Sequence, residues 1–232
     1  MQTSRYDVIV VGAGLAGLAC AHEALDRGSK PLVLEAKHYV GGRTASWIDH
    51  GMPVESEHHR FLGFYKELPR LLHASGVELN DILCWEDEVV VRAPGAAEAR
   101  FGASPVFRPI RTLTGALGNN HFLRPSDKAR LAAFFAAGLV DDVRRPTELD
   151  QEDIESYGRR HGLSDRAIER VVVPASAGVF FLPPAEYSAY AFFATVAKAV
   201  RRPHRLRIGA FEGGMTEVMA GPIVATAGSW GS

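Results

Sequence analysis

The alternation of apolar and polar positions predicts a strand–helix–strand unit near the start of the chain. Residues 6–11 form a nearly continuous apolar run rich in β-branched side chains, which is typical of a strand buried on both faces. Apolar residues at helical spacing follow over 18–25, and Gly28 is the expected stop of that helix. A second apolar run over 31–34 completes a βαβ unit.

Short strands and then helices are expected further along the chain. Residues 83–92 and 99–107 read as two strands of a second sheet, separated by Ala93-Pro94-Gly95. The other expected elements are a hairpin or irregular strand pair over 47–54 and several helices. These helices lie around 68–72, over 109–119, from Pro125 onward, after Pro183-Pro184, and over 216–221.

The helix that begins at Pro125 carries one apolar side, made of Leu131, Phe134, Phe135, Gly138 and Leu139. This side is either ordinary protein core or a face that meets a membrane or lines a lipid tunnel. We favour the core, because amphipathic helices usually bury their apolar stripe. The later helix over 187–196 is apolar nearly all round, so we expect it to be buried or to line an apolar cavity.

The turn between the first strand and its helix has the spacing of a dinucleotide-binding loop. In Gly12-Ala13-Gly14-Leu15-Ala16-Gly17, the first glycine permits a tight turn and the second a close approach to a pyrophosphate. The third lets the helix pack on the strand, and the helix N-terminus attracts the anion. Glu35 ends the second strand about 20 residues later, where a carboxylate binds ribose hydroxyls and disfavours a 2′-phosphate. These residues predict an ADP-containing dinucleotide.

A second glycine pair follows the acid, in Glu35-Ala36 and then Gly41-Gly42-Arg43-Thr44. Alone it would read as a turn with a solvated arginine, but next to the ribose acid it offers another close backbone approach and a cation suited to phosphate. This order resembles the FAD-binding flavoprotein superfamily that includes amine oxidases, protoporphyrinogen oxidase and the carotenoid desaturases. The resemblance implies FAD as the dinucleotide.

Later segments are similar to the phytoene desaturase branch, with hydroxysqualene dehydroxylase close by. They are Ser46-Trp47, residues 55–63, residues 181–188 and the turn Gly213-Gly214-Met215. Glu57 departs from the pattern, because the family usually has a glycine there. The chain is also about half the usual family length, within the size range of two interwoven lobes. The alternatives that follow are a fragment, a truncated paralogue, or one half of a split enzyme.

The resemblance implies an α/β fold: a Rossmann-like FAD-binding fold of the glutathione-reductase type with an inserted α+β substrate lobe, C-terminally truncated. Residues 1–62 and 204–232 are expected to form the FAD-binding domain and residues 63–203 the substrate and helical lobe. The expected cofactor residues are Gly12, Ala13, Gly14, Leu15, Ala16, Gly17, Glu35, Ala36, Gly41, Gly42, Arg43, Thr44, Gly213 and Gly214. His59 is the candidate catalytic residue beside the flavin.

The implied activity is that of an FAD-dependent oxidoreductase, a desaturase or dehydrogenase acting on an apolar polyisoprenoid such as a carotenoid precursor. Two alternatives remain open: a flavin amine oxidase, and a non-catalytic or split FAD-binding subunit that needs a partner chain. The expected partners are the isoprenoid substrate, a membrane surface that delivers it, and a complementing chain or a second copy of this one.

Composition and charge limit the other function classes. A net charge of −1 gives no reason to expect nucleic acid as a partner. Cys20 and Cys84 form no metal spacing, and His50, His58 and His59 complete no recognisable ligand set, so we expect no metal. With no signal peptide or spanning segment visible, we expect a cytoplasmic protein that is peripheral to a membrane.

Overall fold

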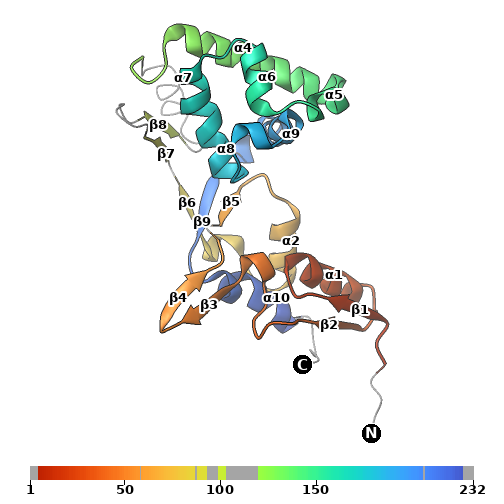
Figure 1. Cartoon of the computed structure of the whole chain (residues 1–232). Helices are drawn as coiled ribbons and strands as arrows, with labels where there is room; N and C mark the ends of the chain where they lie inside the picture. Colours follow the sequence, from red (N-terminus) through yellow and green to blue (C-terminus); the bar gives the residue numbers. More distant parts are fainter. Residues whose placement is uncertain are drawn as a thin grey trace. The chain divides into compact units, whose positions relative to one another are not determined.

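A computed structural model describes residues 5–57, 59–86, 88–92, 99–102, 120–205 and 207–226 (Figure 1). The chain divides into two compact units: the first comprises Met1–Trp85 and Ile208–Ser232, and the second comprises Glu86–Arg207. Residues 63–85 thus belong to the first unit, whereas the expected boundary of the second lobe was residue 63. The role of each unit stays a prediction.

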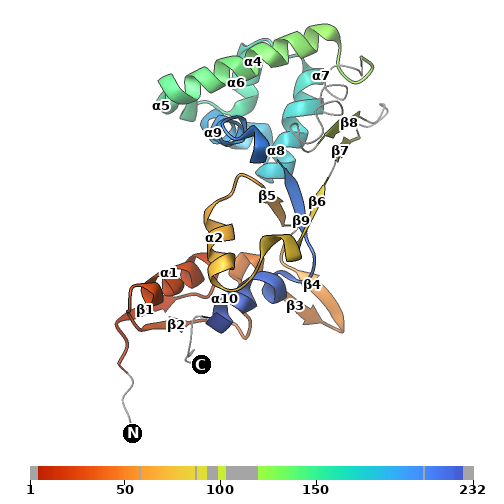
Figure 2. The ribbon, with the colours of Figure 1, turned by 180° about the vertical axis from the view of Figure 1, so that it is seen from behind.

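The first unit contains the predicted strand–helix–strand arrangement. Strand β1 (Val8–Val11) and strand β2 (Pro31–Leu34) pair in parallel, with Val10 opposite Val33, and helix α1 (Leu15–Asp26) connects them. Both views show α1 on one side of the strand pair (Figure 1, Figure 2). Gly28 follows the helix with φ +78°, a left-handed conformation that suits glycine, so its predicted role as the stop is confirmed.

The β1–β2 pair is covered on one face only. Val10 and Val33 are buried in a core with Leu18, whereas Ile9 is 63%, Val11 84% and Leu34 44% exposed. The expectation of a first strand buried on both faces is therefore wrong. Parallel sheets normally have both faces covered, and the described residues supply a cover for only one face here.

The rest of the first unit is built from short strands and helices. A hairpin joins β3 (Ser46–Asp49) and β4 (Met52–Glu55), as predicted. A three-stranded sheet has the order β5 (Arg60–Leu62), β9 (Ile208–Phe211), β6 (Leu83–Glu86). The helices are α2 (Glu67–Ala74) and α10 (Gly221–Thr226), the second of which continues from a π-helical turn over Thr216–Ala220. A 3₁₀ turn over Gly42–Thr44 precedes β3.

The second unit combines a hairpin with a group of helices. Strand β7 (Glu88–Val91) pairs with β8 (Ala99–Gly102). The single strand expected over 83–92 is therefore wrong, because its two parts, β6 and β7, pair in different sheets. The helices are α4 (Pro125–Arg144), α5 (Pro146–Asp150), α6 (Ile154–Arg160), α7 (Asp165–Ala167), α8 (Val173–Val179) and α9 (Ala189–Val200). The helix expected over 109–119 and the strand residues 103–107 lie outside the described residues.

The core of the second unit is aromatic. Phe134 of α4 and Phe193 of α9 have no exposed surface, and their rings lie 5.1 Å apart. Leu131 and Gly138 of α4 are buried on the same side, which supports the interpretation of that side as core. Within the described part of the chain, no helix is both long and apolar enough to cross a bilayer.

Candidate functional site

The glycine loop joins β1 to α1 by a tight turn. Gly12 has φ +98°, and its N–H donates to the carbonyl oxygen of Leu34 at 2.7 Å, which ties the turn to the end of β2. A Cβ on Gly17 would overlap the carbonyl oxygen of Gly12, so only glycine lets α1 lie this close to the turn. Because α1 begins at Leu15, the N–H groups of its first turn have no partner within the helix and are available to an anion.

Glu35 lies directly beside this loop. Its Oε2 accepts a hydrogen bond from the N–H of Ala13 at 2.7 Å, and its Oε1 accepts one from the N–H of Lys37 at 3.0 Å. The Ala13 N–H, followed by that of Lys37, holds the pKa of Glu35 below its ordinary value of 4.5. An ionised carboxylate offers about four acceptor positions, so Glu35 retains positions for ribose hydroxyls. Ala36, the next residue, is exposed.

The depressed pKa of Glu35 predicts a pH dependence of stability. Such a group stabilises the fold above pH 4.5, and the contribution is lost as the pH falls through its lower folded-state pKa. Glu35→Gln keeps an acceptor for Ala13 but does not titrate. We expect acidification from about pH 6 to about pH 3 to shift the urea midpoint of the wild-type chain more than that of the variant. Equal shifts would show that Glu35 is not held ionised by the loop.

The second glycine pair packs against the first loop. Gly41 donates its N–H to the carbonyl oxygen of Ala13 at 2.8 Å, and a Cβ on Gly42 would stand 3.2 Å from the Cα of Gly14. Both glycines have positive φ, +112° and +60°. The hydroxyl of Thr44 closes the turn by donating to the Gly41 carbonyl at 2.8 Å.

The structure thus brings most of the predicted cofactor residues together. Contacts at Ala13 and Gly14 join three segments: residues 12–17, Glu35, and residues 41–44. The contacting residues are up to 28 positions apart along the chain. The side chain of Arg43 is exposed. The arrangement presents backbone N–H groups, two close backbone approaches and an ionised carboxylate, which suits a pyrophosphate joined to a ribose.

His59 and Gly213 belong to a neighbouring cavity of the same unit. This cavity, of about 370 Å³, is lined by Glu55, Glu57, His59, Ala210, Phe211, Gly213 and Met215. The Nε2 atom of His59 is shielded from solvent and has no hydrogen-bond partner among the described residues. The cavity therefore has the His59 side chain and two glutamates in its lining, together with the apolar residues Phe211 and Met215.

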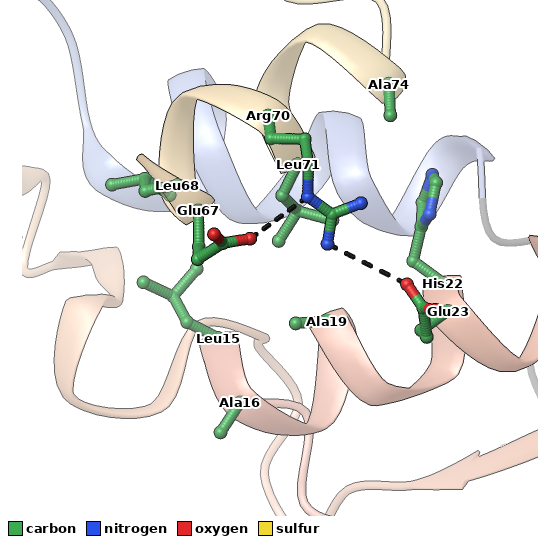
Figure 3. A pocket seen from close by; sticks show the side chains of 10 residues that line it. All are labelled: Leu15, Ala16, Ala19, His22, Glu23, Glu67, Leu68, Arg70, Leu71 and Ala74. Atoms are coloured by element: carbon green, nitrogen blue, oxygen red, sulfur yellow. Dashed lines mark hydrogen bonds and ion pairs between the residues drawn. The ribbon is translucent and has the colours of Figure 1, made fainter. Parts of the chain in front are cut away.

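A second hollow lies between α1 and α2. Its volume is about 260 Å³, and its lining residues are Leu15, Ala16, Ala19, His22, Glu23, Glu67, Leu68, Arg70, Leu71 and Ala74 (Figure 3). Arg70 pairs with Glu67 at 3.0 Å and with Glu23 at 3.7 Å (Figure 3). These are exposed ion pairs of small energy. The predicted cofactor residues Leu15 and Ala16 thus also line this hollow between α1 and α2.

Sequence reasoning missed Ser46, Glu55 and Thr216. Their side chains hold the Gly213-Gly214 turn and, through Thr216, the Gly41-Gly42 turn. Ser46 and Thr216 follow glycine pairs in the sequence, and Ser46 and Glu55 lie in segments that resemble the family, but nothing in the sequence indicates that the three side chains meet. Among the described residues, no group of three or more His, Cys, Asp or Glu side chains is arranged for a metal ion.

Comparisons with known proteins give a consistent result. The sequence profile of the family described as "Flavin containing amine oxidoreductase" matches residues 15–221. A 15-cis-phytoene desaturase of Narcissus pseudonarcissus is 30% identical over 224 residues, which is 94% of this chain and 39% of that protein. A zeta-carotene desaturase of Capsicum annuum is 29% identical over 210 residues, covering 84% of this chain and 36% of the relative. The chain thus spans about two fifths of the length of these relatives.

The fold matches solved amine oxidase structures. Wild-type putrescine oxidase bound to putrescine aligns with a TM-score of 0.69 at 20% identity, over 97% of this chain and 49% of that one. Such a likeness concerns the fold alone. The chain therefore has a mixed α/β fold that corresponds to about half of an amine oxidase structure.

Proposed function

This chain belongs to the flavin containing amine oxidoreductase family, and on that premise we propose that it is an FAD-dependent desaturase or dehydrogenase of an apolar polyisoprenoid such as a carotenoid precursor. The main support for the proposal is that hydrogen bonds to the backbone of Ala13 hold the two glycine turns and Glu35 together. The sequence identity of 30% to a phytoene desaturase and of 29% to a zeta-carotene desaturase supports the choice of substrate class.

The residues of the first unit fit FAD. The N–H groups at the start of α1 would bind the pyrophosphate, and Glu35 would accept hydrogen bonds from the adenosine ribose. The turn over Gly41–Thr44 would give the second close backbone approach, with Arg43 as a phosphate partner. We assign to this unit the Rossmann-like FAD-binding fold of the glutathione-reductase type, and to the second unit the substrate lobe.

The chain's own residues would position and shield the reactants. FAD, when bound, supplies hydride acceptance from an allylic C–H bond. The cavity that holds His59 and Gly213 would receive the reacting part of the substrate, and Phe211 and Met215 would exclude water from it. His59, with its unsatisfied Nε2, would take or give a proton at that atom. An apolar substrate of this kind partitions into lipid, so we propose that the protein acts at a membrane surface.

Anaerobic flavin bleaching tests the proposal. The FAD-loaded chain is mixed with 15-cis-phytoene in liposomes, or with putrescine, and the visible flavin absorbance is followed. Bleaching by the polyisoprene alone is the expected result. A chain that holds FAD and is bleached by neither compound would contradict the proposed reaction.

The carboxylates of the cavity favour a second candidate, a flavin amine oxidase. Glu55 and Glu57 both line the cavity, and two carboxylates attract a cationic amine more than a hydrocarbon. Glu57 also stands where the carotenoid desaturases usually have glycine. Bleaching by putrescine and not by the polyisoprene would favour this candidate.

The uncovered face of the β1–β2 pair favours a third candidate, an FAD-binding subunit that needs a complementing chain. Ile9, Val11 and Leu34 form an exposed apolar patch on this face. A chain that takes up FAD only after a second polypeptide is added would support it. Full uptake by the isolated chain, with a monomeric mass in sedimentation, would contradict it.

A further inference from the structure

Two hydroxyl side chains far apart in the sequence bond to each other's backbone. The N–H of Ser46 donates to Oγ1 of Thr216 at 2.9 Å, and the N–H of Thr216 donates to Oγ of Ser46 at 2.9 Å. Ser46 begins strand β3, and Thr216 begins the helical segment that ends the described chain. This reciprocal pair joins residues that are 170 positions apart.

The opposite strand of the hairpin holds the same turn. Glu55 of β4 stands directly across from Ser46, and its Oε1 accepts the N–H of Met215 at 3.2 Å. The first N–H groups of a helical segment lack partners within that segment. Ser46 and Glu55 therefore act as its cap from a different part of the chain. A Cβ on Gly214 would stand 2.7 Å from Ser46 Oγ, so the glycine permits this close approach.

Thr216 extends the contact to the candidate cofactor loops. Its hydroxyl, which accepts from Ser46, donates to the carbonyl oxygen of Val40 at 3.1 Å. Val40 immediately precedes Gly41, whose N–H donates to the Ala13 carbonyl. One hydroxyl thus lies at the junction of the C-terminal segment, the β3–β4 hairpin and the turn that packs on the Gly14 loop.

We infer that Thr216, with Ser46, is a positioning residue that holds the Gly41–Thr44 turn against the Ala13–Gly14 loop and thereby sets the affinity for FAD. The inference rests on the proposed function for its ligand, but its geometry concerns the chain alone. Without the Thr216 hydroxyl, the Ser46 N–H and the Val40 carbonyl lose their partner. Leaving a half-buried N–H or carbonyl group without a hydrogen-bond partner costs free energy, so we expect the Gly41–Thr44 turn to move away from the Ala13–Gly14 loop.

The test compares three variants. Thr216→Val keeps the shape of the side chain and removes the hydroxyl, and Thr216→Ser restores the hydroxyl. Thr226→Val is the matched control, because the Thr226 hydroxyl donates, among the described residues, to carbonyls of its own helix alone, those of Pro222 and Ile223. We expect Thr216→Val to weaken FAD binding about tenfold. Thr216→Ser and Thr226→Val should bind FAD as the wild-type chain does.

Amide exchange in the FAD-free chain gives a second, independent readout. The Gly41 N–H is bonded to Ala13 and the Thr44 N–H to the Gly41 carbonyl. We expect both to exchange about tenfold faster in Thr216→Val and at the wild-type rate in the other variants. Faster exchange with weaker binding supports the inference.

Unchanged exchange in Thr216→Val would overturn the inference, as would faster exchange with unchanged FAD affinity. An equal loss of FAD affinity and amide protection in Thr226→Val would also overturn it, because the effect would then come from general destabilisation of the C-terminal helical segment. A wild-type chain that binds no FAD would instead contradict the proposed function, and the exchange rates would then decide alone whether Thr216 positions the turn.

Discussion

Gly17→Ala is expected to abolish FAD uptake and to lower the free energy of unfolding of the first unit by about 3 kcal/mol. The added Cβ would overlap the carbonyl oxygen of Gly12 and stand 3.3 Å from Cγ1 of Val10. The first of these is a backbone atom in a turn fixed by its bond to Leu34, so no side-chain rotation relieves the overlap. The gain of about 1 kcal/mol in helix propensity from glycine to alanine does not offset it. Helix α1 would have to move away from β1, and the anion site at its start would move with it.

Tryptophan fluorescence is suited to this measurement. Of the three tryptophans in the chain, the two among the described residues, Trp47 and Trp85, lie in the first unit, and the segment of the second unit has none. A urea titration followed by tryptophan emission therefore reports on that unit. Cys20→Ala is the matched control, because Cys20 is an exposed residue of the same helix; we expect a change within about 0.5 kcal/mol. A Gly17→Ala chain that unfolds with the wild-type midpoint and still takes up FAD would refute this account of the loop.

Gly138→Ala is expected to lower the free energy of unfolding of the second unit by about 2 kcal/mol while leaving the first unit intact. A Cβ at this position of α4 would overlap the ring of Phe193 on α9. The ring cannot yield, because it is fully buried and packed against Phe134, Phe192 and Tyr157. Close-packed interiors resist added volume in this way.

The second unit contains no tryptophan, but it is rich in helix, so its unfolding is followed by far-ultraviolet circular dichroism. We expect the helical signal of Gly138→Ala to be lost at lower urea, while tryptophan emission and FAD affinity stay at wild-type values. The control is Val143→Ala, at a 64% exposed position of the same helix, with an expected change within about 0.5 kcal/mol. Coincident shifts of both signals would show that the two units unfold together.

The part of the fold that the sequence predicted is the part specified locally. The turn over Gly12–Gly17 lies between an apolar run and a helical pattern. Two of its glycines have a local reason: Gly12 has a positive φ, and Gly17 lies against the carbonyl oxygen of Gly12. The apolar side of α4 could also be predicted, because helical periodicity identifies the buried side of a helix without knowledge of what packs on it. That Phe193 of α9 packs on this side could not be predicted from periodicity.

The predictions that failed depend on long-range pairing. The run over 83–92 has the composition of one strand, yet β6 pairs with β9 and β7 with β8. The β7–β8 pair lies within the two strands expected on either side of Ala93-Pro94-Gly95, whereas the pairing of β6 with β9 is not visible in local periodicity. The outer face of β1 is apolar in sequence, which predicts burial, but burial also requires an element to cover it. The contact between Thr216 and Val40 joins residues 176 positions apart, and neither residue type is distinctive.

The measurement that tests the central claim most directly is the visible absorption spectrum of the purified chain incubated with FAD and freed of excess, followed by quantification of the flavin that heat releases. The account predicts an oxidised-flavin spectrum and FAD in near-equal amount to protein, held by the two glycine turns and Glu35. A colourless protein that takes up no added FAD, although its tryptophan emission shows the first unit to be folded, would contradict the proposal that this chain binds FAD on its own.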